Sequence, residues 1–316
     1  MSLFRPPALS AIILNYNHSR YILNSINAAA SQTRPFDEII VIDDASTDDS
    51  AALIESRIRD VPRARLIRNE KNMGVMLSTN LGLRESTGDY LFFMSADDSY
   101  SPHIVEWCHS ALEACPHVAM ISGNTRIRNA DTGGERVFHL PFPQKIGCFG
   151  RRDVSRVARN QAFTFNVGAN VVRRDAFIAA GQLIPALKWH SDWFLYLVIA
   201  SRETFAAVPH EFVTVRQAGD QYSHACFHWP SQRPVIETLL QTLKTCYPDL
   251  YVFFRDCALL PTYDVEALGL WASNPTFRHY LTPLLFWRLL TYKPLRLLSR
   301  LCPDNARTIM RRLVRV

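Results

Sequence analysis

Residues Ile39–Ser50 read IIVIDDASTDDS, four consecutive apolar residues followed by a run of acidic and hydroxyl side chains. A continuous run of β-branched residues is typical of a strand covered on both faces of a parallel sheet. In such sheets, ligands bind beyond the carboxyl ends of the strands, which is where Asp43, Asp44 and Ser46 fall. The segment therefore predicts a buried strand that delivers polar side chains to a ligand site.

Short β-rich runs alternate with helical stretches on both sides of this segment. The predicted strands are Ala11–Leu14, Glu38–Ile42, Arg65–Ile67, Tyr90–Met94 and Val118–Ile121. The predicted helices between them are Tyr21–Ala30, Asp48–Arg59, Val75–Glu85 and Ile104–Ala114, the second with Ser46 and Asp48 as capping residues. This alternation predicts an α/β fold, with a mostly parallel sheet flanked by helices.

The second half of the chain is less regular. Residues 124–165 are mixed, and the pattern then returns with strands Ala169–Val172, Phe205–Val208 and Phe212–Arg216 and helices Asp175–Ala180 and Asp192–Ala200. We interpret these elements as the completion of the same sheet. After about Ser223 the composition becomes helical, aromatic and basic. We therefore expect residues 1–224 to form the α/β domain and residues 225–316 a helical basic region with an acceptor, membrane or oligomer role.

Composition limits the classes of partner. The chain has 316 residues, 48% of them apolar, and a formal charge of +6. A chain of this length and composition can form one large hydrophobic core without the support of disulfide bonds or a structural metal. The charge favours phosphates or anionic lipid, and no recognition motif points to nucleic acid, so no nucleic-acid partner is expected.

The cysteines and the N-terminal residues indicate in which cellular compartment the protein is expected to lie. Seven cysteines are present without a C-x-x-C pair, which predicts reduced, buried thiols in a cytosolic protein. The first residues contain only a brief apolar run, Ala11–Leu14, which is too short for a signal peptide or a membrane span. We therefore expect a cytoplasmic protein, with peripheral contact at the inner face of the membrane left open.

Polar residues follow three of the predicted strands. Asn15 and Asn17 follow the first strand, the Asp43–Asp44 pair follows the second, and Asp97–Asp98 follows the fourth. Adjacent carboxylates repel each other, and a divalent cation relieves this repulsion. Mg²⁺ or Mn²⁺ binds through one or two carboxylates together with substrate phosphate oxygens. Two acidic pairs on one sheet edge therefore favour a metal and phosphate site over a solvated turn.

The order and spacing of these motifs resemble family 2 glycosyltransferases with the GT-A fold. The stretch Ile39–Ser50 resembles the family's strand followed by D-D-x-S-x-D-x-S. Residues Asn69–Asp98, NEKNMGVMLSTNLGLRESTGDYLFFMSADD, resemble its asparagine- and glycine-rich run that ends in D-D. Weaker matches are Gly168–Gly181, Lys188–Leu195 and a closing motif formed by Arg216, Gln221 and Ser223, so the likeness covers roughly residues 8–224. A sugar-phosphate nucleotidyltransferase is disfavoured, since the loop after the first strand has no glycine.

The resemblance implies a role for each motif residue. Asn15, Asn17, Asp43, Asp44, Ser46, Asn72 and Asp97 are expected to bind the nucleotide-sugar donor. Within this set, Asp44 would accept a hydrogen bond from the imide of a uridine or thymidine base, so a UDP-sugar is favoured. Asp98 would be the direct ligand of a divalent metal, Mn²⁺ or Mg²⁺.

The resemblance also implies the reaction. Asp192 would be the general base that activates the acceptor hydroxyl, and the transfer would invert the anomeric centre. The expected acceptor is a glycan or a lipid-linked glycan of the cell envelope, as in surface polysaccharide or O-antigen synthesis. Ser191 and Ala218 depart from the family pattern, where glutamate and a metal-binding histidine are usual. His190, His224, water or donor phosphate would then complete the metal ligands, and a catalytically degenerate nucleotide-sugar binder remains the alternative.

Further basic and aromatic residues have two interpretations each. Arg151, Arg152, Arg156 and Arg159 could reach the diphosphate or an anionic acceptor, or form a solvated surface. Trp189 and Trp193 could stack on a sugar or fill the core. The tail from Arg278 to Val316 interleaves leucines with arginines, which suits either peripheral membrane contact or a helical cap. A homo-oligomer is also left open.

Overall fold

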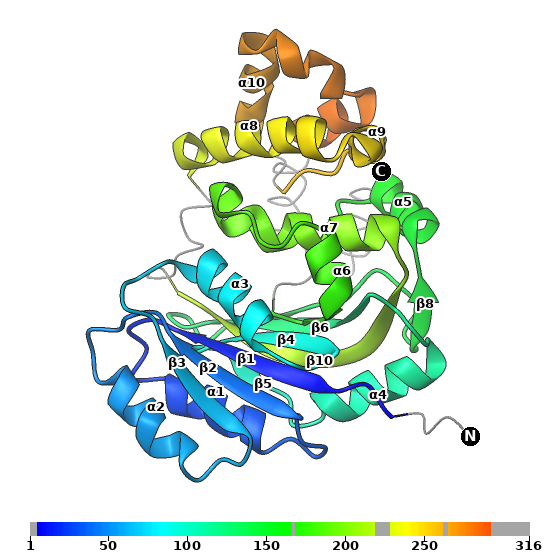
Figure 1. The fold of residues 1–316 in the computed structure, drawn as a ribbon. Coiled ribbons are helices and arrows are strands. Elements are labelled where there is room, and N and C mark those ends of the chain that lie inside the picture. Colours follow the sequence, from blue (N-terminus) through cyan, green and yellow to red (C-terminus); the bar gives the residue numbers. More distant parts are fainter. Residues whose placement is uncertain (1–4, 166–167, 219–227, 262–264, 292–316) are drawn as a thin grey trace.

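The computed structural model describes residues 5–165, 168–218, 228–261 and 265–291 (Figure 1). Its strands are β1 (Leu9–Asn15), β2 (Glu38–Asp43), β3 (Ala64–Arg68), β4 (Tyr90–Ser95), β5 (Ser99–Tyr100), β6 (Met120–Asn129), β7 (Glu135–Phe138), β8 (Gly147–Phe149), β9 (Asn170–Arg173) and β10 (Phe205–Gln217). Its α-helices are α1 (Ile22–Ala30), α2 (Ser50–Ile58), α3 (Val75–Glu85), α4 (Ile104–Ala114), α5 (Arg151–Asn160), α6 (Arg174–Ala179), α7 (Ser191–Arg202), α8 (Trp229–Cys246), α9 (Pro248–Asp256) and α10 (Leu268–Ser273). Short 3₁₀ turns are η1 (Pro185–His190), η3 (Val265–Ala267) and η4 (Pro275–Tyr280).

The ten strands form one mixed sheet in the order β3-β2-β1-β4-β9-β6-β10-β5, with β7 beside β6 and β8 beside β10. Strands β1 to β4 run parallel, and β9 lies antiparallel between β4 and β6. The mostly parallel α/β architecture predicted from the sequence is therefore confirmed. The two strands predicted at the end of the domain are one strand, β10, whose register against β6 shifts between Ala207 and Val213.

Alternate residues of each strand face two separate hydrophobic cores. On β1, Ile13 packs with α1, α2 and α4, whereas Ile12 packs with α3 and α7. Figure 1 shows the corresponding layers, with α1, α2 and α4 below the sheet and α3, α6 and α7 above it. A strand buried on both faces needs a continuous apolar run, which is the pattern of the first two strands.

Helix α7 is the middle layer of the upper half. All of its residues from Trp193 to Ser201 are buried. A helix that is apolar all round must be covered all round, and α8 to α10 lie on its far side in Figure 1. Side chains of α7, α8, α9 and α10 belong to one hydrophobic cluster with Ile12 and Ile40 of the sheet. The helical region expected after residue 224 thus packs onto the α/β part, although the division point lies in residues 219–227, outside the described ones.

The prediction that the cysteines are reduced is wrong for one pair. Cys115, after α4, forms a disulfide with Cys148 of β8, with their Cα atoms 5.7 Å apart. Residues 33 positions apart meet because β8 returns to pair with the start of β10 beside the end of α4. Cys108 and Cys257 are buried free thiols and Cys246 is exposed, while Cys226 and Cys302 lie outside the described residues.

No helix within the described residues is both long enough and apolar enough to cross a membrane. Most of the basic tail considered for membrane contact, residues 292–316, lies outside those ranges.

Candidate functional site

The carboxyl ends of β1 and β2 are joined by a buried polar network. Asn15 Nδ2 donates to Asp43 Oδ2 at 2.8 Å and lies 3.1 Å from Ser46 Oγ. The backbone N–H of Ser46 donates in turn to Asp43 Oδ1 at 2.9 Å. Asn15 Oδ1 is buried and has no hydrogen-bond partner among the described residues. An unsatisfied buried acceptor is uncommon, and a ligand or water that donates to it would satisfy it.

The loops above this network have unusual backbone conformations. Asn17 and Ala45 both have positive φ, 55° and 60°, which is uncommon for a residue with a Cβ atom. These conformations bring the two loops together: Asn17 N donates to Ser46 Oγ, and Thr47 N donates to Asn17 Oδ1. Strained backbone of this kind is concentrated at ligand sites.

Asp44 organises the loop that follows β3. Its carboxylate accepts hydrogen bonds from Asn69 Nδ2 at 2.6 Å, Met73 N at 2.9 Å and Gly74 N at 2.8 Å. Gly74 N also lies 2.9 Å from Asn72 Oδ1. Gly74 has φ of +82°, a conformation that suits glycine. The predicted residues Asp44 and Asn72 therefore both hold the loop before α3, Asp44 from the end of β2 and Asn72 from within the loop.

The turn after β4 is held from below. Ser25 Oγ of α1 lies 2.9 Å from the Ala96 carbonyl and 3.0 Å from that of Ser95. Tyr100 OH accepts a hydrogen bond of 2.6 Å from Ser95 N. Since strand β4 lies next to β1, these contacts fix the second acidic pair at the same sheet edge as the first.

Asp97 and Asp98 lie in this turn beside Arg216 of β10. Arg216 N donates to Asp98 Oδ1 at 3.0 Å, and its guanidinium lies 3.9 Å from Asp97 Oδ2 and over the ring of Tyr21. Burial and then the charge of Asp97 raise the pKa of Asp98 to about 7. A buried carboxylate next to a second one gains from any cation that reaches both.

The residues around this pair permit only a sparse metal site. Within the described ranges, no group of three or more His, Cys, Asp or Glu side chains could hold a metal. Ala218 is buried and has no ligand atom. His190 is packed against Gln232 of α8, with 2.6 Å between Nε2 and Oε1, and burial lowers its pKa to about 4. His224 lies outside the described residues. The carboxylates of Asp97 and Asp98 still fit a hard cation that takes its other ligands from phosphate.

Asp192 occupies the first turn of α7, apart from these networks. Its Oδ1 accepts a 2.6 Å hydrogen bond from Trp193 N, and burial raises the pKa of its carboxyl to about 6. The segment before it contains Lys188 with φ of 46°, and Ser191 Oγ accepts from Ile184 N at 2.6 Å. Ser191, which departs from the family pattern, therefore secures this segment.

Sequence reasoning missed several residues that build the site. Arg216 belongs to the closing motif of the family. The sequence did not predict its contact with Asp97, because that contact depends on β10 ending beside the turn after β4. Ser25 lies outside every motif, and Asn69 begins the asparagine- and glycine-rich run, but the sequence did not predict that they anchor the turn after β4 and the carboxylate of Asp44. Of the two tryptophans, Trp193 is a core residue, packed edge-on against Phe254.

Of the two interpretations of the arginine-rich stretch, contact with the diphosphate is disfavoured, because the structure places these arginines away from Asp97, Asp98 and Arg216. These arginines lie on α5, which follows β8, and β8 pairs with the first residues of β10, Phe205 to Ala207. Arg216 lies near the other end of the same strand. At about 3.3 Å per residue, the two ends are roughly 30 Å apart.

Comparison with known sequences identifies the family. The family described as "Glycosyl transferase family 2" matches residues 10–179. An uncharacterized glycosyltransferase of Nostoc sp. is 33% identical over 136 residues, covering 41% of this chain and 42% of that protein. Chondroitin synthase of Escherichia coli is 32% identical over 136 residues, covering 43% of this chain and 19% of the synthase. The chain thus spans less than half the length of these relatives, and the family match ends before Asp192.

Comparison with solved structures confirms the fold. TarS residues 1–349 of S. aureus in complex with UDP superpose with a TM-score of 0.57 and 15% identity, over 91% of each chain. The same fragment in complex with UDP-GlcNAc has a TM-score of 0.57 over 84% of this chain and 79% of TarS. At this identity the likeness establishes the architecture alone, which is the GT-A fold.

Proposed function

This chain belongs to glycosyl transferase family 2, and we propose on that basis that it transfers a sugar from a nucleotide diphosphate to an acceptor hydroxyl. The observation that carries the proposal is the acidic pair Asp97–Asp98 at the sheet edge, with Asp98 buried and Arg216 beside it. A pair of this kind suits a cation and a diphosphate better than it suits solvent. The sheet edge on which it lies also holds the Asn15–Asp43 network.

We expect the nucleotide to bind over the ends of β1 and β2. Asn15, Asp43 and Ser46 form the floor there, and the unsatisfied Oδ1 of Asn15 can accept from a donor that reaches it. The predicted contact of Asp44 with the base remains part of the proposal, with the addition that Asp44 also holds residues 69–74 in place. A UDP-sugar is the favoured donor, in agreement with the UDP-GlcNAc complex of the structural neighbour TarS.

Asp98 is the residue we expect to hold a divalent cation, Mn²⁺ or Mg²⁺, together with oxygens of the diphosphate. A cation bound there neutralises charge on the leaving diphosphate. Asp97 would contact ribose or sugar, and the Arg216 guanidinium adds positive charge at the same point. Asp98 and the donor phosphates suffice for such a site, because hard cations bind through few carboxylates when phosphates are present.

Asp192 is our proposed general base. Its raised pKa, about 6, keeps it mostly ionised at neutral pH while making it a better proton acceptor than an ordinary aspartate. It would take the proton of the acceptor hydroxyl as that oxygen attacks the anomeric carbon, in a single displacement that inverts the centre. This role extends beyond the family match and rests on the motif around Trp193 and on the raised pKa of the partly buried Asp192.

The acceptor is proposed to be a glycan or lipid-linked glycan of the cell envelope, at a peripheral site on the membrane. The chondroitin synthase relative supports polysaccharide synthesis in general. A cytoplasmic location stays a prediction, against which the Cys115–Cys148 disulfide counts, because disulfides persist mainly in oxidising compartments.

The test is calorimetric titration of UDP into the folded protein with and without Mn²⁺, with GDP and dTDP as comparison nucleotides. We expect metal-dependent UDP binding that is lost in Asp98→Ala. Asp60→Ala is the matched control, since Asp60 is exposed and follows α2 at the opposite end of the sheet. Release of sugar-transfer product from a UDP-sugar panel then distinguishes an enzyme from a binder without turnover. Absence of nucleotide binding under every metal condition would contradict the proposal.

A further inference from the structure

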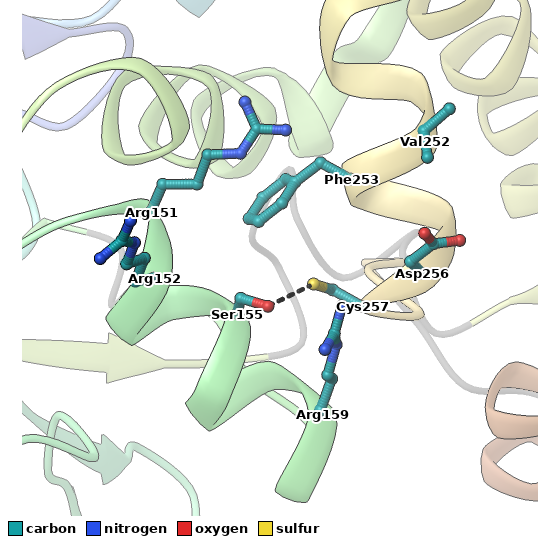
Figure 2. A pocket seen from close by; sticks show the side chains of 8 residues that line it. All are labelled: Arg151, Arg152, Ser155, Arg159, Val252, Phe253, Asp256 and Cys257. Atoms are coloured by element: carbon teal, nitrogen blue, oxygen red, sulfur yellow. Dashed lines mark hydrogen bonds between the residues drawn. The ribbon is translucent and has the colours of Figure 1, made fainter.

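A pocket of about 480 Å³ lies between α5 and α9, away from the donor site. Figure 2 shows its lining, in which one wall comes from each helix. The α5 wall consists of Arg151, Arg152, Ser155 and Arg159, and the α9 wall of Val252, Phe253, Asp256 and Cys257. Residues spaced by four lie on one face of a helix, so α5 turns two arginines and the serine between them toward the same groove.

The walls of this pocket are fixed by a buried arginine. The Arg288 guanidinium, 3% exposed, donates to the Cys257 carbonyl at 3.0 Å after α9 and to the Ala158 carbonyl near the end of α5. Ser155 Oγ lies 3.5 Å from Cys257 Sγ across the groove. The pocket is therefore preformed, and a ligand would not have to bring the two helices together.

The positive charge in the pocket is only partly balanced by the protein. The pKa of Asp249, at the start of α9, is lowered mainly by its hydrogen bond with Arg202 and further by the charge of Arg151. Arg151, Arg152 and Arg159 have no carboxylate partner within 4.0 Å in the described part of the chain, whereas Arg156 on the same helix pairs with Asp153 at 2.9 Å. The pocket's one acid, Asp256, is paired with Arg255 at 2.8 Å. Arg151 and Arg159 thus face the groove without a carboxylate in ion-pair contact, whereas Figure 2 shows Arg152 turned to the outer side of α5.

The Arg151 guanidinium is oriented so that it can bind an anion. The Arg151 guanidinium lies over the ring of Phe253, 4.6 Å from its centre, and Figure 2 shows Arg159 extending toward Cys257. A guanidinium stacked on a ring keeps its N–H edge available, and this edge matches the oxygens of a phosphate. The Ser155 hydroxyl between the two arginines adds a further donor.

We propose that this pocket binds the phosphate monoester of a small organic phosphate. Arg159 and the Ser155 hydroxyl hold the phosphate oxygens at one end of the groove, and the body of the ligand extends along Phe253 toward Arg151 at the other end. The pocket is larger than inorganic phosphate requires, which favours an ester. The site is separate from the donor site, because α5 starts at the opposite end of β10 from Arg216, so its test does not depend on the proposed transferase activity.

The experiment is calorimetric titration of sn-glycerol 3-phosphate into the full chain in EDTA, which removes metal-dependent binding at the donor site. Glycerol at the same concentration is the uncharged comparison. The double variant Arg151→Gln/Arg159→Gln is compared with Arg156→Gln, which removes one positive charge from the outer face of the same helix. We expect saturable binding that is at least about tenfold weaker in the double variant and within about twofold of wild type in the control.

Flotation with phosphatidylcholine vesicles, with and without phosphatidic acid, separates a lipid source of the phosphate from a free one. Vesicle binding that the double variant loses assigns the phosphate to a lipid headgroup, and titration with the soluble ester alone assigns it to a free metabolite. If the double variant does not fold, hydrogen exchange of wild type with the ester must protect residues 151–160 and 248–257. Absence of binding, equal weakening by Arg156→Gln, or protection elsewhere would each overturn the assignment.

Discussion

Individual carboxylates in this protein differ because their surroundings differ. Asp43 and Asp44 accept several hydrogen bonds from neighbouring amides. Asp98 is buried and has a second carboxylate beside it, and Asp192 is partly buried at the start of α7. Desolvation raises the pKa of both carboxyls. Sequence placed these acids at the ends of elements correctly, but their different environments come from segments distant in the chain. The raised pKa of Asp192 affects both the pH dependence of catalysis and the stability of the folded protein.

The fall in the rate of sugar transfer at acidic pH is expected to reflect protonation of the Asp192 carboxylate. The base must be ionised, so kcat for sugar transfer, at Mn²⁺ and donor concentrations that keep Asp98 ionised, should rise with pH through an apparent pKa of about 6 and level off above it. Asp192→Asn should lower kcat by roughly 10²–10⁴-fold with UDP affinity retained. The measurement is initial rates from pH 4.5 to 8, with Asp60→Asn as the control. A profile flat through pH 6 would show that another group is the base.

Asp192 should also reduce the stability of the folded protein. Its folded-state pKa lies above the ordinary value of 3.8, so the folded state resists its ionisation, and the cost grows as pH rises from about 4 to 6 and stays constant above. Asp192→Asn removes this cost and should raise the free energy of unfolding at pH 7.5 by about 1–2 kcal/mol. Urea unfolding at pH 7.5 and pH 4 measures it. An equal gain at both pH values would contradict this explanation.

At the scale of the element, close packing of α3 on the sheet positions the donor loop. A Cβ atom at Gly82 would lie 2.5 Å from Ile12 Cγ2 and 3.1 Å from Ile42 Cδ1. The absence of a side chain therefore lets α3 approach β1 and β2, and the start of α3 is where Gly74 contacts Asp44. The spacing of these glycines was visible in the sequence as a motif, and its reason is this contact.

Gly82→Ala is expected to destabilise the protein by about 1–3 kcal/mol, because overpacking displaces Ile12. Gly269→Ala, in α10, is the matched control: no atom lies within 4 Å of its added Cβ. There the helix preference of alanine should stabilise the protein by roughly 0.5–1 kcal/mol. Thermal and urea unfolding of both variants give the comparison, and a gain in both would mean that α3 does not pack this closely.

At the scale of the whole molecule, the GT-A part and the helical region share one hydrophobic cluster. Helix α7 is buried on the sheet side and on the side of α8, where Leu239 and Leu243 are fully buried. Gln232 of α8 also contacts His190, two residues before Asp192. The helical region therefore supports the segment that bears the proposed base, whatever its role toward the acceptor.

A chain that ends at residue 218 should fail to fold as a soluble monomer, since it would expose the outer face of α7. The full chain should unfold in one cooperative transition. Size-exclusion chromatography and calorimetry of both chains test this expectation. A monomeric truncated chain with its own cooperative transition, or two resolved transitions in the full chain, would show that the two parts fold independently.

The sequence by itself determined the order of the main strands and helices up to Ile121, the two acidic pairs at the strand ends and the family motif, whereas β5, β7, β8 and α5 were not predicted from it. These features are local: hydrophobic periodicity fixes an element, and a residue that follows a strand lies at its carboxyl end. Only the tertiary structure decided that Arg216 lies beside Asp97, that Cys115 meets Cys148, and that Arg151 and Arg159 of α5 face α9. Each of these contacts joins residues far apart in the chain, and their meeting depends on how strands pair and layers pack, which no local pattern encodes.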